Sequence, residues 1–174
     1  MAILRKNTVG KSKGRHQVAV LLGGNLGDVM ATFKQVEIRF RALGEILQSS
    51  SVYRTEAWGM QGAPDFYNQV LLLETGLEPE ELMERMLGIE KELGRSRNTS
   101  PQYTSRPIDL DILFYDRLVL ETKKLVIPHP RLQQRRFALQ PLEELIPDYE
   151  HPVLRKTIST LILELDDNLS VTKV

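Results

Sequence analysis

Residues 106–114, RPIDLDILF, alternate apolar and acidic side chains as a β-strand does when only one of its faces is buried. Side chains two residues apart in a strand share a face, so Asp109 and Asp111 point together, away from their apolar neighbours. Two carboxylates roughly 7 Å apart along a strand repel each other unless a positive group lies between them. The pattern is typical of a site for a hard divalent cation such as magnesium or of the solvated face of an edge strand.

The rest of the chain supplies the elements of an α+β fold. Strand-like segments are 18–22, 46–54, 69–74 and 108–115, and helical segments are 28–43 and 79–93. The helix at Pro79 has proline where the first turn tolerates it, and Gly94 ends that helix. The order strand, helix, strand, strand, helix, strand predicts a ferredoxin-like α/β/α sandwich with a mostly antiparallel sheet. Further helical patches and a short tail follow residue 128.

Length and charge limit the class of protein. A chain of 174 residues fits one domain, expected at 17–174, after a disordered N-terminal extension at 1–16. Lys+Arg and Asp+Glu are equal at 23 each, so no overall charge draws the chain to nucleic acid or to an anionic membrane. It has no cysteine and no apolar run long enough for a signal peptide or a membrane helix, which is compatible with the cytoplasm.

A basic loop precedes the acidic strand. Arg95, Arg97 and Arg106 lie within twelve residues, and guanidinium groups match phosphate oxygens bidentately. Arginine-rich loops are commonly just solvated surface. The adjacent Asp109 and Asp111 favour a triphosphate that a metal bridges to the strand.

Residues 128–137, PHPRLQQRRF, form a second basic group, in which His129 and Arg135 are candidate phosphate contacts. The segment 23–28, GGNLGD, lies between a strand and a helix but lacks the lysine and the spacing of a Walker motif. Asp28 would also repel a phosphate, so a turn in which Asp28 or Asn25 caps the helix is expected there.

Residues 64–70, PDFYNQV, precede a buried strand, where aromatic side chains normally join the core. The alternative is a site for a flat heterocycle. Phe66 would stack on the ring and the amide of Asn68 would bind its polar edge.

Six segments in this order resemble the 6-hydroxymethyl-7,8-dihydropterin pyrophosphokinase family of folate synthesis. They are GGNLGD, SSVYRTEAWG, PDFYNQV, IEKELGRSR, RPIDLDILFYD and VIPHPRLQQRRFALQPL, and the resemblance covers residues 18–147. It implies a ferredoxin-like fold and two magnesium ions, held by Asp109 and Asp111, that bridge the phosphates of ATP. It also implies that Arg95, Arg97 and Arg106 lie on or beside a mobile catalytic loop.

The resemblance assigns the substrate contacts as well. For ATP it implies Glu90, Lys124, His129 and Arg135. For the pterin it implies Phe66 and Phe137 on the two ring faces, Asn68 at the polar edge, and Thr55 and Trp58 in the loop at the rim. The expected partners are these two small molecules only, bound by a monomer, with no nucleic acid and no membrane.

Four positions depart from the family pattern. Gly24 stands where serine is usual, and Tyr103 stands where some members have tryptophan. Glu56 and Trp58 replace a proline and an aliphatic residue in the pterin loop. These departures bear on side-chain contacts at the pterin rim and in the catalytic loop, whereas backbone contacts would survive.

The predicted reaction is transfer of pyrophosphate from MgATP to 6-hydroxymethyl-7,8-dihydropterin, with release of AMP. One alternative is a metal-dependent nucleotide phosphohydrolase that uses the same acids. The other is an RNA-binding module on a ferredoxin-like sheet, but VAVLL and QVLLLE lack the exposed aromatic residues that such modules use.

Overall fold

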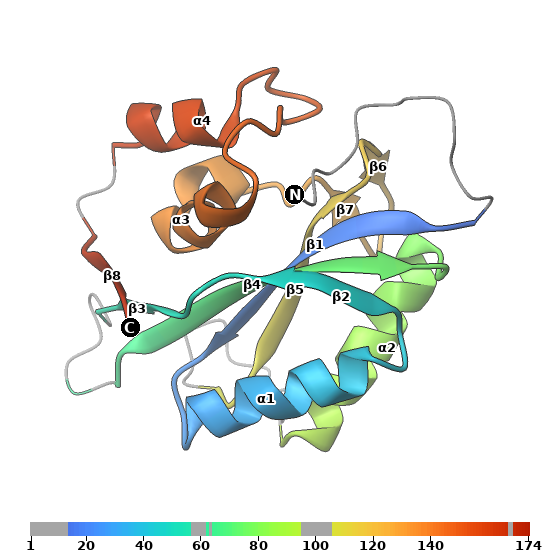
Figure 1. Ribbon diagram of the computed structural model, residues 1–174, viewed down its shortest axis with the longest axis vertical. Helices are drawn as coiled ribbons and strands as arrows, with labels where there is room; N and C mark the ends of the chain where they lie inside the picture. The colour runs from blue at the N-terminus through green and yellow to red at the C-terminus, as the bar shows by residue number, and fades with distance from the viewer. Residues whose placement is uncertain (1–13, 57–61, 63, 95–105, 167–168) are drawn as a thin grey trace.

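The computed structural model describes residues 14–56, 62, 64–94, 106–166 and 169–174 (Figure 1). Its helices and strands, in chain order, are β1 (His16–Gly24), α1 (Val29–Phe40), β2 (Glu45–Ser49), β3 (Tyr53–Thr55), β4 (Phe66–Thr75), α2 (Pro79–Glu92), β5 (Asp109–Tyr115), β6 (Leu120–Glu121), β7 (Val126–Ile127), the 3-10 helix η1 (Leu132–Gln134), α3 (Arg136–Leu145), α4 (Ile158–Glu164) and β8 (Val171–Lys173).

The main sheet has the order β5-β1-β4-β3-β8, with β2 also paired to β4, and its strand pairs are antiparallel. Strand β5, which follows α2, returns to the sheet beside β1, so β1 lies between β4 and β5. This is the ferredoxin-like arrangement, and the predicted fold class is confirmed. Strands β6 and β7 form a separate two-stranded sheet.

Helices cover both faces of the sheet, α1 and α2 on one side and α3 and α4 on the other (Figure 1). Two hydrophobic clusters fill the two interfaces. On the first side, buried residues of α1 at Val29, Phe33, Val36 and Phe40 follow the helical repeat and pack with residues such as Leu22 of β1. On the second side, α3 and α4 pack on the alternate residues of β1 and β4. Each strand of the sheet centre is therefore apolar on both faces.

The predicted helix starts agree with the structure. The Asp28 side chain caps α1, since its Oδ1 accepts a hydrogen bond from the backbone N–H of Ala31 at 2.9 Å. Pro79 occupies the first turn of α2. Asn25, the other capping candidate, has different partners that are described with the site below.

The single strand expected at 46–54 is instead two strands, β2 and β3, with a break at Ser50. The Ser50 side chain causes this break, because its Oγ accepts the hydrogen bond of the Val70 N–H at 2.9 Å in place of a backbone carbonyl. Its own N–H still donates to the Val70 carbonyl at 2.9 Å. The chain thus stays on β4 while its direction changes, and β3 continues along β4 beyond the break.

Three strand boundaries also differ from the sequence prediction. Strand β1 begins at His16, so that residue belongs to the sheet, and residues 1–13 lie outside the described residues. Strand β4 begins at Phe66, so Phe66 and Asn68 are strand residues and not part of the preceding loop. The tail contains β8, which pairs with β3. Within the described part of the chain, no helix has the length and apolar character needed to cross a bilayer.

Candidate active site

The two acids of β5 lie on one face of the sheet, as predicted. The carboxylates of Asp109 and Asp111 are 28% and 29% exposed, while Leu110 between them is 1% exposed and packs in the cluster below α1 and α2. The acids therefore face the side of the sheet that carries α3. The predicted alternation of this strand is confirmed.

A guanidinium group lies beside each acid. Nη1 of Arg106 is 2.9 Å from Oδ2 of Asp109, and Nη1 of Arg135 is 3.9 Å from Oδ2 of Asp111. Arg106 precedes β5, whereas Arg135 comes from the turn between η1 and α3. The positive groups that the paired acids need thus come from two distant parts of the chain, and they remain partly exposed to a ligand.

Glu90 of α2 holds the backbone between the two acids. Its side chain is 2% exposed, and its Oε1 accepts a hydrogen bond from the Leu110 N–H at 2.7 Å. A buried carboxylate bonded to an edge-strand amide satisfies a donor that the sheet leaves unpaired. The contact holds the strand backbone between Asp109 and Asp111 against α2, and the predicted contact of Glu90 with ATP stays a prediction.

His129 lies next to Arg135, with its Nε2 3.4 Å from Nη1 of the arginine. Its Nδ1 accepts a hydrogen bond from the Arg131 N–H at 3.2 Å, so the hydrogen of a neutral ring is on Nε2. Burial first, and then the charge of Arg135, lower the pKa of His129 to about 4, which keeps the ring neutral at pH 7. Nη1 of Arg135 and Nε2 of His129 thus lie close enough together for one anionic oxygen beside them to contact both.

Asn68 of the predicted pterin site lies in the same row of the sheet as Asp109. Gly23 of β1 is opposite Asn68 of β4 on one side and opposite Asp109 of β5 on the other. Neighbouring strands are about 4.8 Å apart, so Asn68 and Asp109 are separated by about 10 Å across the sheet. Because Gly23 has no side chain, the buried amide of Asn68 can approach the backbone there. A Cβ at Gly23 would lie 3.0 Å from Oδ1 of Asn68.

The two predicted aromatic contacts also lie on this side of the sheet. Phe66 shares a face of β4 with Asn68, which follows it by two residues. Phe137 lies in the first turn of α3 and packs on the hydrophobic cluster beneath that helix. The guanidinium of Arg135 lies over the Phe137 ring, with Cζ 5.6 Å from the ring centroid. Arg135 therefore links the phosphate side of the site to the aromatic side.

Asn25 joins the loops on the two sides of the site, a role that the sequence did not indicate. Its backbone N–H donates to the Arg106 carbonyl at 3.0 Å, and its Oδ1 accepts from the Arg106 N–H at 2.8 Å. Its Nδ2 donates to the Pro64 carbonyl at 3.3 Å. These partners are 81 and 39 residues away in the chain, so no local pattern could reveal them.

The neighbouring Gly24 explains one departure from the family pattern. A Cβ on Gly24 would lie 2.5 Å from the carbonyl oxygen of Pro107, closer than real Cβ atoms approach a backbone atom. The glycine thus permits the close contact between the end of β1 and the segment that carries Arg106. A serine at position 24 requires a different spacing here.

Thr55 ends β3 beside the predicted pterin rim. It is 5% exposed, and its buried Oγ1 has no hydrogen-bond partner among the residues that the structure describes. A buried hydroxyl without a partner costs free energy that a bound ligand could recover. Trp58, the other predicted rim residue, lies outside the described residues, as do Arg95, Arg97 and Tyr103.

Lys124 is the predicted residue that the described contacts do not bring to the acids. It lies in the turn between β6 and β7, is 69% exposed at its side chain, and its Nζ is 3.4 Å from Oε1 of Glu84 on α2. Its predicted contact with ATP stays a prediction.

The donor set fits magnesium. Within the described ranges, no group of three or more His, Asp or Glu side chains could enclose a metal ion. Two carboxylates on one strand suit a cation that keeps waters and takes substrate phosphate oxygens as its other ligands. An antiparallel α+β sandwich with such acids, flanked by guanidinium groups, defines a phosphate-transferring enzyme class.

Comparison with known sequences identifies the particular class. Residues 19–147 match the family described as 7,8-dihydro-6-hydroxymethylpterin-pyrophosphokinase. The 2-amino-4-hydroxy-6-hydroxymethyldihydropteridine pyrophosphokinase of Synechocystis is 39% identical over 153 residues, which are 87% of this chain and 77% of that protein. The protein of the same name from Aquifex aeolicus is 38% identical over 137 residues, 79% of this chain and 84% of that protein. The chain belongs to the 7,8-dihydro-6-hydroxymethylpterin-pyrophosphokinase family.

Solved structures agree on the fold. The crystal structure of wild-type Plasmodium falciparum HPPK-DHPS with pteroate superposes with a TM-score of 0.70 at 16% identity, over 90% of this chain and 43% of that chain. This chain thus spans less than half of that solved chain, and the likeness bears on the fold alone. The predicted family, fold and enzyme class are confirmed, whereas the phosphohydrolase alternative finds no support in relatives that are named as pyrophosphokinases.

Proposed function

We propose that this chain transfers the pyrophosphoryl group of MgATP to the hydroxymethyl oxygen of 6-hydroxymethyl-7,8-dihydropterin, giving the pterin diphosphate and AMP for folate synthesis. The observation that carries the proposal is the row Asn68, Gly23 and Asp109 across three adjacent strands. It sets a group that can read a heterocycle about 10 Å from an acid that can hold a metal, with a glycine that has no side chain between them. The reacting atoms would meet over Gly23.

In this proposal Asp109 and Asp111 hold two magnesium ions. When bound, magnesium neutralises phosphate charge and polarises the phosphorus under attack. The described structure supports this assignment, because both acids are partly exposed, face the same side of the sheet and have their backbone fixed by Glu90.

The basic side chains would bind the phosphates. Arg106, Arg135 and the Nε2–H of His129 point donors at the region beside the acids, and Arg95 and Arg97 complete the predicted set. The bond from the hydroxymethyl oxygen to the β-phosphorus forms as the bond from that phosphorus to the α,β-bridging oxygen breaks, the hydroxyl proton is released to solvent, and charge moves onto the AMP phosphate. Fixed cationic donors stabilise that charge without reorganisation. Exclusion of water by the arginine segment would suppress ATP hydrolysis.

The pterin would lie between Phe66 and Phe137, with Asn68 at its polar edge and Thr55 and Trp58 at the rim. The proximity of Asn68 to Gly23 supports this placement, as does the Oγ1 of Thr55, which has no hydrogen-bond partner in the described part of the chain. Glu90 and Lys124 remain proposed ATP contacts. The working unit would be a monomer of residues 17–174 in the cytoplasm, with these small molecules as its partners.

Release of AMP tests the proposal directly. MgATP is incubated with the protein in the presence and absence of 6-hydroxymethyl-7,8-dihydropterin, and AMP and pterin diphosphate are quantified. The proposed transfer gives both products in equal amounts and only when the pterin is present. Phosphate or pyrophosphate released from ATP without the acceptor would identify a hydrolase instead.

Arg106→Ala is expected to lower kcat by about a hundredfold, with the dissociation constant for the pterin changed less than threefold. The side chain contacts Asp109 on the phosphate side of the row, away from Asn68. Single-turnover rates and equilibrium pterin binding would separate the two effects, and Arg95→Ala should behave in the same way. A pterin affinity that collapses while the rate holds would reverse the assigned role.

His129 is expected to stay neutral well below the pH at which an ordinary histidine becomes charged. Its pKa in the folded chain is about 4, compared with 6.5 for an unperturbed ring. The folded chain therefore binds fewer protons than the unfolded chain between these pH values, so this residue lowers stability as the pH falls through that interval. Two-bond ¹H–¹⁵N spectra of the rings at pH 5 should show a neutral His129 protonated on Nε2. A charged ring at pH 5 would contradict the expectation.

A further inference from the structure

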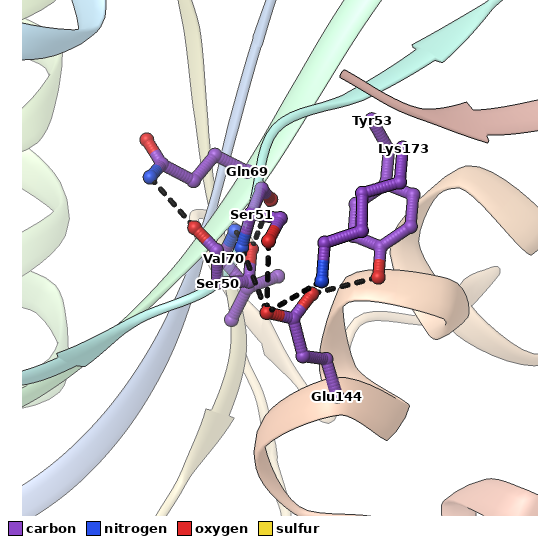
Figure 2. A network of polar contacts seen from close by, with 7 residues as sticks. All are labelled: Ser50, Ser51, Tyr53, Gln69, Val70, Glu144 and Lys173. Atoms are coloured by element: carbon purple, nitrogen blue, oxygen red, sulfur yellow. Dashed lines mark hydrogen bonds and ion pairs between the residues drawn. The ribbon is translucent and has the colours of Figure 1, made fainter.

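Glu144 of α3 makes polar contacts with three residues from two other segments of the chain (Figure 2). Its Oε2 accepts a hydrogen bond from the Tyr53 hydroxyl at 2.7 Å. Its Oε1 accepts from the Ser51 N–H at 3.1 Å and from the Ser51 hydroxyl at 3.0 Å, and Nζ of Lys173 is 3.5 Å away. A single carboxylate thus connects α3 to the start of β3 and to β8.

The contacts require an ionised Glu144. Burial by itself raises the pKa of this carboxyl, but the hydrogen bonds from Tyr53 and Ser51 and the charge of Lys173 outweigh burial, and the pKa falls below its ordinary value. Burial and the bond to Glu144 raise the pKa of Tyr53 to about 12. At neutral pH the tyrosine therefore donates to a carboxylate, and hydrogen bonds of that kind are stronger than neutral ones.

The strand that Glu144 holds lies directly beside the proposed pterin residues. In the pairing of β3 with β4, Tyr53 is opposite Asn68 and Thr55 is opposite Phe66. Strand β3 has three residues, and its other edge is paired with β8, where Tyr53 is opposite Lys173. A strand this short relies on neighbouring elements for its position.

The helix that carries Glu144 also carries the opposite side of the pterin site. Phe137 lies in the first turn of α3 and Glu144 near its end, so the two residues move together if the helix shifts. The Glu144 contacts thus act together with the core packing of α3 on the separation between Phe137 on α3 and Phe66 on β4. A flat ring sandwiched between two aromatic side chains tolerates little change in that separation.

We propose that Glu144 is a positioning residue for the pterin, which sets the width of the ring site by tying α3 to β3 and β8. The inference rests on the proposed function, because the site between Phe66 and Phe137 belongs to it. Glu144 does not touch the substrate in this proposal and acts through Tyr53 and Ser51.

The nucleotide side of the site has supports of its own. The Arg135 N–H donates to the Leu132 carbonyl at 3.1 Å, and the His129 N–H donates to the Leu113 carbonyl of β5 at 3.0 Å. Arg106 is held by Asn25. Loss of the Glu144 contacts should consequently affect the pterin much more than ATP.

The test is steady-state kinetics of Glu144→Gln and Tyr53→Phe in the full chain, with AMP release as the readout. The amide of glutamine has one oxygen and cannot accept all of the hydrogen bonds that the Glu144 carboxylate accepts. KM for the pterin is therefore expected to rise about tenfold. Tyr53→Phe removes one bond and should raise it about threefold. KM for ATP and kcat at saturating substrates should stay within about twofold of the wild type.

Tyr149→Phe is the matched control. It also removes a tyrosine hydroxyl on the α3 side of the sheet, one that donates to the Asp116 carbonyl at 2.7 Å at the far end of β5. This variant should leave KM for the pterin unchanged even if its melting temperature falls. An equal rise of KM for the pterin in Tyr149→Phe would show that the Glu144 effect is general destabilisation, and it would overturn the inference.

Other outcomes separate the inference from the function. If the wild type converts the pterin but both variants keep its KM, or if KM for ATP rises equally, the positioning role is wrong and the proposed function stands. A wild-type chain that releases no AMP with the pterin overturns the function, and the inference with it. Should Glu144→Gln fail to fold, Tyr53→Phe decides by the same comparison, since phenylalanine preserves the ring packing.

Discussion

Asp109→Ala and Asp111→Ala are each expected to lower turnover by about three orders of magnitude, with the fold retained. Both carboxylates are partly exposed, and the neighbouring Leu110 and Ile112 supply the packing on the opposite face of β5, so removal of the acids leaves the core intact. Each substitution also removes the carboxylate next to Arg106 or Arg135, and with it a proposed ligand for the magnesium bound to ATP. Pterin-dependent AMP release measures the turnover, and circular dichroism with thermal melting measures the fold.

Glu74→Ala provides the control for this pair. Glu74 is also a carboxylate on a strand of the main sheet, and its Oε1 lies 2.9 Å from Nη1 of Arg15, but it stands at the opposite end of β4 from Asn68. Its loss should leave turnover unchanged. Near-normal activity in both aspartate variants would remove the metal assignment, and a large loss in the control would mean that the assay reports charge or stability instead of the site.

Gly23→Val is expected to lower kcat/KM for the pterin by about a hundredfold or more, and Gly23→Ala by about tenfold. Gly23 is the position without a side chain between Asn68 and Asp109, where the two substrates would meet. A Cβ added at Gly23 would lie 3.0 Å from Oδ1 of Asn68, so alanine must displace the Asn68 side chain slightly. Valine adds two further methyl groups above Gly23, between Asn68 and Asp109. Comparison of the two variants measures how strongly turnover depends on side-chain volume at position 23.

Two controls separate the effect of added side-chain volume at Gly23 from an effect on stability. Valine is favoured in strands, and Gly23 lies within β1. The melting temperature of Gly23→Val should therefore not fall in proportion to its activity. Gly88→Ala adds a Cβ in α2 where no atom lies within 4 Å and should have no effect on turnover. Full activity of Gly23→Val would show that the substrates do not meet over this row.

Much of the fold follows from local patterns. The acid alternation of β5 and the starts of α1 and α2 depend on residues within a few positions of one another, and the structure agrees with each. The break at Ser50 was missed because its partner, Val70, is on another strand. Strand β8 was missed because three residues carry too little periodicity to be recognised without the strand they pair with.

The sequence by itself determined the chemistry that the site contains: two carboxylates on one face, nearby arginines, and a phenylalanine and an asparagine beside a buried strand. Only the tertiary structure decided which of them meet. The register of β1 with its two neighbours brings Asn68 and Asp109 into one row, and the packing of α3 brings Arg135 to Asp111. Side-chain periodicity is a property of neighbouring residues, whereas strand register and helix packing minimise the free energy of the whole chain, so distant contacts such as those of Asn25 and Glu144 have no local signature.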